Sequence, residues 1–264
     1  MGAYEQALGV VLDRIASVAG LPRTVDAAVL GDLAAILATT RRVEDRAGAK
    51  AVLPAVAGFS LLVSTLADAA RGDVAAPALG LASEIAQYRG WLLLATGDHS
   101  RGVSQLDTAI SAGQESGFGD RLATGLSFKA YALLQAGSRS AGLGLTQAAL
   151  AVPVVHPSIR CYDMFQLARI HAIAGAHRQA ERALGQAVRA AARLHDDPPA
   201  SVYWYTQGFW AMMQGLILGL LGHGDEAVQI TRAGIELLPA DQRHAEWVSD
   251  WDTRHQVGQW DQIV

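Results

Sequence analysis

The segment WLLLATGDHSRGVSQLDTAISAG (residues 91–113) decides the fold, because its pattern returns three more times along the chain. Each copy has an apolar helix end, a glycine, a few polar residues and then a second amphipathic stretch. The other copies are YALLQAGSRSAGLGLTQAALAV (131–152), IHAIAGAHRQAERALGQAVRAA (170–191) and ILGLLGHGDEAVQITRAGIELLP (217–239). An internal repeat of this kind is typical of stacked helix pairs.

A glycine marks the turn in every copy: Gly97, Gly137, Gly175 and Gly222. Glycine reaches the left-handed conformation that often ends a helix and that residues with a Cβ resist. Small residues recur five and twelve positions later, at Gly102, Gly142, Ala180 and Ala227 and at Ala109, Ala149, Ala187 and Gly234. Because small residues let two helix backbones approach closely, the pattern predicts antiparallel helix pairs joined by short turns.

The composition agrees with an all-helical chain. Hydrophobic residues make up 51% of the 264 residues and charged residues 17%, and the chain is rich in alanine and contains no asparagine. We expect a single helical domain over residues 1–264, with divergent helices in 1–80, recognisable repeats in 81–239 and a capping helix in 240–264. The expected helices are 4–19, 25–45, 50–71, 75–96, 99–116, 119–136, 139–152, 158–175, 177–195, 202–221, 224–238 and 241–257.

Charge and cysteine content exclude several classes of protein. A net charge of −4 disfavours direct nucleic-acid binding, which normally needs a basic surface. The single cysteine, Cys161, excludes an internal disulfide framework. The N-terminus has no signal-peptide pattern, and the apolar stretches 51–67 and 208–222 are too short or too interrupted to span a membrane. We therefore expect a cytoplasmic protein whose apolar stretches are core helices.

The repeat pattern resembles the tetratricopeptide repeat, which implies a right-handed superhelix of helix pairs, an α-solenoid. A larger part of the chain, about residues 20–250, is similar to the C-terminal repeat domain of XRE-type helix-turn-helix regulators of high-GC bacteria. The similarity is carried by LGDLAAILATTRRVEDRAGAKAVLPAV (30–56), SEIAQYRGWLLLATGDHSRG (83–102) and LLPADQRHAEW (237–247). The DNA-binding domain of that family has no counterpart here. The chain is thus either a stand-alone relative or the sensor half of a regulator, and DNA binding is not carried over.

No catalytic, cofactor or metal motif stands out. His171 and His177 are six residues apart, which is not a ligand spacing on one helix face, and the pair Asp196–Asp197 is followed by two prolines that break a helix. Cys161 has Arg160 and Asp163 as neighbours but no placement at a helix N-terminus that would clearly lower its pKa, so we expect a buried side chain. We therefore expect no metal and no cofactor, and binding is favoured over catalysis.

The first helix of each pair predicts a candidate ligand-binding groove. In tetratricopeptide arrays this helix lines the concave surface, and residues 13, 10 and 6 positions before each turn glycine share one helix face. The candidates at these positions are Glu84, Gln87, Trp91, Ser127, Tyr131, Tyr162, Phe165, Arg169, Phe209 and Met212. Equivalent positions should lie side by side, so Trp91 should neighbour Tyr131, Tyr131 should neighbour Arg169, and Arg169 should lie beside Leu216.

We call these ten candidate residues the groove stripe. Two interpretations of the stripe stay open: a site for a small molecule, peptide or partner protein, or simple core packing. A buried Arg169 needs an anion, which a ligand or the internal acid Glu84 could provide. Near the C-terminus, Trp247 and Trp251 lie on one helix face and fit either a cap over the last repeat or an oligomerisation surface.

The sequence therefore predicts a binding module, a sensor or adaptor that uses its concave groove. Two alternatives remain. One is a helical biosynthetic enzyme that uses the same groove, with Arg169, Tyr131 or Glu84 as polar groups; the other is a passive scaffold. A homodimer also stays open.

Overall fold

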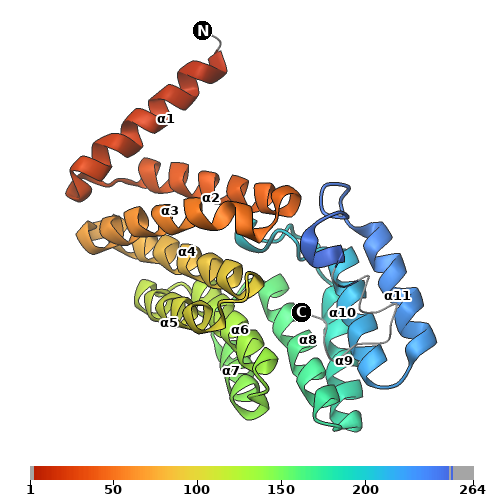
Figure 1. Cartoon of the computed structure of the whole chain (residues 1–264). Coiled ribbons are helices and arrows are strands. Elements are labelled where there is room, and N and C mark those ends of the chain that lie inside the picture. Colours follow the sequence, from red (N-terminus) through yellow and green to blue (C-terminus); the bar gives the residue numbers. More distant parts are fainter. Residues whose placement is uncertain (1–2, 250, 252–264) are drawn as a thin grey trace. The chain divides into compact units, whose positions relative to one another are not determined.

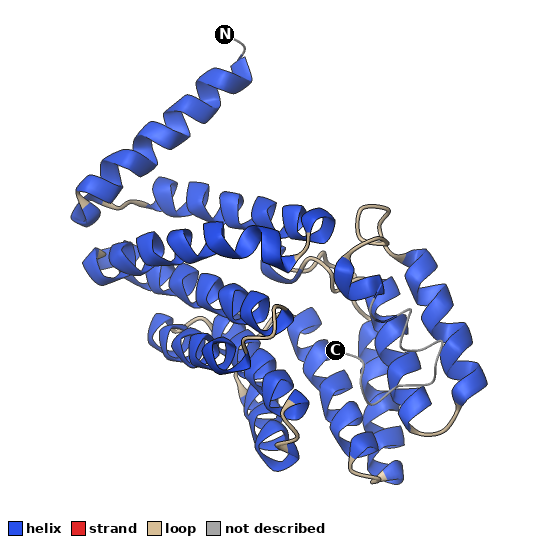
Figure 2. Ribbon diagram, in the orientation of Figure 1, coloured by secondary structure: helices blue, strands red, loops and turns tan. Residues whose placement is uncertain are grey.

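The computed structural model describes residues 3–249 and 251, and every regular element in this part of the chain is a helix (Figure 2). The residues form two compact units, which are described separately. Unit 1 comprises residues 1–43 and 49–125, and unit 2 comprises residues 44–48 and 126–264.

Unit 1 contains the first half of the helices labelled in Figure 1. They are α1 (Ala3–Gly20), most of α2 (Ala27–Ala47), α3 (Ala49–Ala69), α4 (Ala75–Ala95), α5 (His99–Ser116) and the start of α6 (Gly119–Gln135). Two short 3-10 turns, Pro22–Thr24 and Gly72–Val74, connect α1 to α2 and α3 to α4. All these bounds lie within about two residues of those predicted from the sequence.

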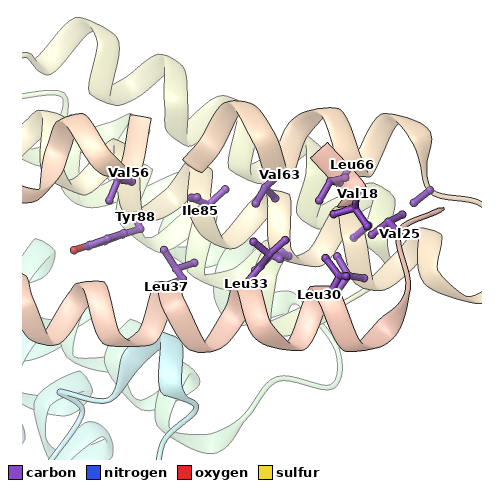
Figure 3. Packing of buried hydrophobic residues seen from close by; sticks show 14 of the residues in the cluster. Val18, Val25, Leu30, Leu33, Leu37, Val56, Val63, Leu66, Ile85 and Tyr88 are labelled. Carbon is purple, nitrogen blue, oxygen red and sulfur yellow. The ribbon is translucent and has the colours of Figure 1, made fainter. Parts of the chain in front are cut away.

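The core of unit 1 is an apolar layer between α2, α3 and α4 (Figure 3). Leu30 and Leu33 of α2 lie opposite Leu66 and Val63 of α3, and Ile85 of α4 belongs to the same layer. By length and composition alone, α3 could cross a membrane. The buried side chains of α3 belong to this layer, but only 28% of its apolar window is buried, so α3 fits the core helix expected for 51–67 only in part.

Unit 2 contains the end of α6, then α7 (Arg139–Ala151), α8 (Pro157–Ile173), α9 (His177–Ala191), α10 (Gln207–Leu220) and α11 (Gly224–Leu237). The sequence placed the start of α10 too early, at residue 202. A 3-10 turn at Ala200–Val202 comes first, and Thr206 caps α10 by accepting a hydrogen bond from the N–H of Phe209. The sequence also placed the start of the 241–257 helix too early, since residues 241–244 form a turn and helical residues begin at 246; residues 250 and 252–257 lie outside the described residues.

Consecutive helices pack as adjacent pairs, and the predicted glycines end the first helix of each pair. Gly97, Gly137, Gly175 and Gly222 have φ angles of 87°, 78°, 71° and 90°, so all four are left-handed, as predicted.

The predicted small residues lie where the helices of a pair cross. A Cβ on Gly234 of α11 would come within 2.7 Å of the carbonyl oxygen of Gly208 in α10. Similarly, a Cβ on Gly102 of α5 would lie 3.2 Å from the carbonyl oxygen of Gly90 in α4. The helix backbones are therefore too close for larger side chains at these positions.

Candidate functional site

The candidate site residues fall into both units. Glu84, Gln87 and Trp91 belong to α4 of unit 1, and the other seven belong to α6, α8 and α10 of unit 2. Ser127 and Tyr131 lie on α6, then Tyr162, Phe165 and Arg169 on α8, and Phe209 and Met212 on α10.

In unit 1, Glu84 is the centre of a buried ion network. Its Oε1 pairs with Arg41 Nη1 at 2.7 Å, and its Oε2 pairs with Arg121 Nη2 at 2.5 Å. Arg41 is only 1% exposed, and its guanidinium lies 4.9 Å from the ring centre of Tyr88. Both oxygens of the acid suggested as a partner for Arg169 are therefore bound by arginines of its own unit.

The other two candidates of unit 1 take part in packing. Gln87 is buried, and the half-buried Trp91 packs against the apolar layer of α2, α3 and α4. The α4 triplet is thus built into the interior of unit 1 by ion pairs and apolar contacts.

In unit 2, Arg169 and Tyr131 are neighbours, as predicted. The guanidinium carbon of Arg169 lies 5.8 Å from the centre of the Tyr131 ring, within the range of a cation–π interaction. Arg169 is only 6% exposed, and Tyr131 is equally buried. The contact joins α8 to α6.

A hydrogen-bonded network continues along the same two helices. The Ser127 hydroxyl donates to Asp163 Oδ1 at 2.5 Å. Gln166 Nε2 donates to the carbonyl oxygen of Ser127 at 3.2 Å and to Thr146 Oγ1 at 3.0 Å, while the Tyr162 hydroxyl donates to Gln166 Oε1 at 3.2 Å. The polar groups of α6, α7 and α8 therefore satisfy each other in the interior of unit 2.

Not every buried polar atom of these helices is satisfied: Asp163 Oδ2, like Gln135 Nε2, has no hydrogen-bond partner among the described residues, and the Asp163 side chain is 0% exposed. Burial raises the pKa of Asp163 to about 8, although the Ser127 hydrogen bond and the charge of Arg160 act in the opposite direction. Burial also raises the pKa values of Tyr162 and Tyr205. Asp163 is therefore mainly a neutral acid at pH 7.

The aromatic residues of the stripe form a packed cluster with the segment 203–210. Tyr162 stacks on Tyr205 with ring centres 5.2 Å apart, and Phe165 stacks on Trp210 at 5.6 Å. Phe209 contacts Tyr205 at 5.4 Å. Every member of this set except Tyr162 is buried, so in the described residues the stripe is mostly core.

The C-terminal tryptophans contact the same cluster. The rings of Trp247 and Trp251 lie 6.2 Å and 6.4 Å from that of Phe209. Asp45, in the α2 segment that belongs to unit 2, accepts hydrogen bonds from the Tyr203 hydroxyl at 2.5 Å and from Trp247 Nε1 at 3.4 Å. Trp247 and Trp251 therefore pack against α10, the first helix of the last predicted repeat, which is where a cap would lie.

Sequence reasoning missed the residues that complete both networks: Arg41, Arg121, Thr146, Asp163 and Gln166. Asp163 and Gln166 lie one position after the predicted Tyr162 and Phe165, on the neighbouring strip of α8. The available signal was an acid and an amide three residues apart, each directly after an aromatic residue of α8, because polar residues that become buried usually need partners.

The remaining candidates for chemistry have structural surroundings. The pKa of the Cys161 thiol is raised to about 12 by burial, so the thiolate is scarce at neutral pH. The His156 side chain caps α8 through the N–H of Ser158. In the described part of the chain, no group of three or more His, Cys, Asp or Glu residues is arranged to hold a metal ion.

Comparison with known proteins adds no assignment. No protein-family model matches this chain, and no curated protein matches it.

Proposed function

We propose that this chain is a regulatory binding module built from tetratricopeptide-like helix pairs, and that unit 2 binds a small molecule beside Asp163. The observation that supports this proposal is the unpartnered Oδ2 of a fully buried carboxyl group. A buried polar atom without a hydrogen bond destabilises a fold by about 1–3 kcal/mol. A ligand that hydrogen-bonds to Oδ2 would remove this destabilisation, so it would bind to the folded unit 2 and stabilise it.

The groups around Asp163 suit a ligand that is partly polar and partly flat. Tyr162 is half-buried and stacks on the buried Tyr205, so an aromatic surface lies beside Asp163, and Arg169 lies one turn further along α8 from Gln166. A ligand with an acceptor group for Arg169 and a hydrogen-bonding group for Asp163 would link α8 to α6. Occupancy would then tighten the contact between these helices, which is how we propose that the module signals to a partner.

Native mass spectrometry of the purified protein tests the proposal. We expect an added mass on the wild-type chain that disappears under denaturing conditions. Asp163→Leu should lose the added mass while circular dichroism still reports a helical fold, because leucine is of similar size and has no atom that can hydrogen-bond to a ligand. Asp225→Asn is the matched control, since it removes one exposed acid of unit 2 and should keep the added mass.

Arg169→Ala provides a second test. If Arg169 contacts the ligand, this variant should lose the added mass while circular dichroism still reports a helical fold. An unfolded Arg169→Ala variant would assign Arg169 to core packing. A wild-type chain without any added mass, or an added mass that survives in Asp163→Leu, would refute the small-molecule proposal.

An enzyme is the second candidate, and the pKa of Asp163 is the observation that favours it. A carboxyl group with a pKa of about 8 exchanges a proton near neutral pH, as a general acid or base must. The two candidates differ in the fate of the bound molecule. Incubation with the released molecule should return it unchanged if the module only binds, and chemically altered if it catalyses.

A further inference from the structure

The solvent-facing side of α9 carries a line of arginines. Arg178, Arg182 and Arg189 lie on α9, and Arg193 lies in the turn that follows it, where its N–H donates to the carbonyl oxygen of Ala190. All four are exposed, and their intervals of four and seven residues place them on one face. We call them the arginine stripe; it spans about 22 Å along the helix axis.

The arginine stripe has no internal counter-charge. None of its four guanidinium groups forms an ion pair or a hydrogen bond with any described residue. Glu181, the one acid on α9, is exposed and also forms no ion pair in the described part of the chain. The stripe therefore presents four positive charges to solvent in a protein whose net charge is −4.

The charges at the N-terminal end of the stripe do not stabilise α9, whereas Arg189 in its last turn is favoured by the helix dipole. Arg178 and Arg182, like Arg189 and Arg193, are like-charged pairs four residues apart, and such pairs destabilise a helix by a few tenths of a kcal/mol. Arg178 also lies in the first turn of α9, where the helix dipole disfavours a positive charge. Four aligned charges without an ion pair to any described residue indicate an external partner.

We propose that the arginine stripe is a docking surface for an acidic peptide segment of a partner protein. Guanidinium groups bind carboxylates through two parallel hydrogen bonds, and a line of four matches a segment with several Asp or Glu residues. This surface belongs to α9 and is separate from the small-molecule site proposed beside Asp163.

The surroundings of the stripe favour a peptide over the other polyanions. A DNA duplex needs a broad basic surface, whereas the stripe is one residue wide and is bordered by Gln179, Glu181 and Gln186. A membrane-binding helix needs apolar side chains beside its basic ones. No large exposed hydrophobic residue of the described chain lies on α9.

Fluorescence anisotropy with a labelled oligoglutamate peptide of about 16 residues, long enough to follow the stripe, tests the proposal. We expect Arg182→Gln/Arg189→Gln to bind the peptide roughly three- to tenfold more weakly than the wild type at low salt. The control variant Arg139→Gln/Arg232→Gln removes the same charge from exposed positions of α7 and α11, and it should bind like the wild type. Thermal melting should show that both variants remain folded.

Equal weakening in both variants would overturn the proposal, because binding would then depend only on net charge. A duplex oligonucleotide and vesicles with anionic lipid serve as competitors at matched charge. Displacement of the peptide by either competitor at lower concentration than by unlabelled peptide would also overturn the choice of a peptide partner. A loss of binding confined to the stripe variant, with weak competition, supports it.

Discussion

The Asp163 carboxyl should make the stability of unit 2 depend on pH. Its pKa is about 8 in the folded chain, against an ordinary value of 3.8. Between these two pH values the folded state keeps a proton that the unfolded state has released, so raising the pH favours unfolding. The stabilising contribution is therefore complete below about pH 4, falls as the pH rises, and is lost above about pH 8.

The size of the effect follows from the difference between the two pKa values. Between about pH 4 and pH 8, the folding equilibrium constant should fall about tenfold per pH unit, so the free energy of unfolding falls by about 1.4 kcal/mol per pH unit. Between pH 5 and pH 7 the loss should approach 3 kcal/mol. Asp163→Asn has the same shape and does not titrate, so its stability relative to the wild type should rise by that amount over the same interval.

Urea unfolding at pH 5, 6 and 7, followed by tryptophan fluorescence, measures this difference. All tryptophans except Trp91 belong to the sequence of unit 2, so the signal reports mainly on that unit. Asp225→Asn is the control, since its exposed side chain should leave the pH dependence of the wild type unchanged. Stability curves of wild type and Asp163→Asn that run parallel with pH would refute the reasoning.

The other predictions concern the backbone and the second buried network, and urea unfolding measures all of them. Val154→Gly should stabilise the chain by about 1 kcal/mol, because Val154 is 93% exposed and has a φ of 49° that a β-branched residue resists; no gain would show that the turn is relaxed. Gly97→Ala should cost about 1 kcal/mol through its left-handed φ alone, since no atom lies within 4 Å of the added Cβ. Gly215→Ala should cost more, about 1–3 kcal/mol, because the added Cβ would lie 2.1 Å from Thr231 Oγ1; equal costs at the two glycines would contradict the close packing of α10 on α11. Glu84→Ala should cost about 3–5 kcal/mol by leaving two arginines without their acid, and a cost below 1 kcal/mol would mean that the ion network is replaceable.

The helices and their turns could be predicted from the sequence because their causes are local. Apolar periodicity defines a helix from residues that are three or four positions apart, and a glycine such as Gly97 ends it through its own backbone freedom. The small residues at helix crossings, such as Gly102 and Gly234, were also readable, because they repeat at fixed distances from these turns. The start of α10 was missed because a 3-10 turn and a Thr206 cap replaced the expected helical pattern.

The candidate site was predictable only in part. The sequence brought Tyr131 and Arg169 together correctly, since both occupy equivalent positions in neighbouring repeats. It left open whether the aromatic stripe is a binding surface or core packing, because burial depends on how many elements cover a helix face. The segment 203–210 and the C-terminal tryptophans provide that cover around Phe209.

By itself, the sequence determined an all-helical chain of paired helices, their turns and the positions where the pairs cross. Only the tertiary structure decided which polar groups meet: Asp163 binds Ser127 from 36 residues away, Arg41 binds Glu84 from 43, and Tyr203 binds Asp45 from 158. The physical reason is distance along the chain. Local backbone preferences act between near neighbours, whereas the partner of a buried charge is selected by the packing of whole helices, which no short stretch of sequence specifies.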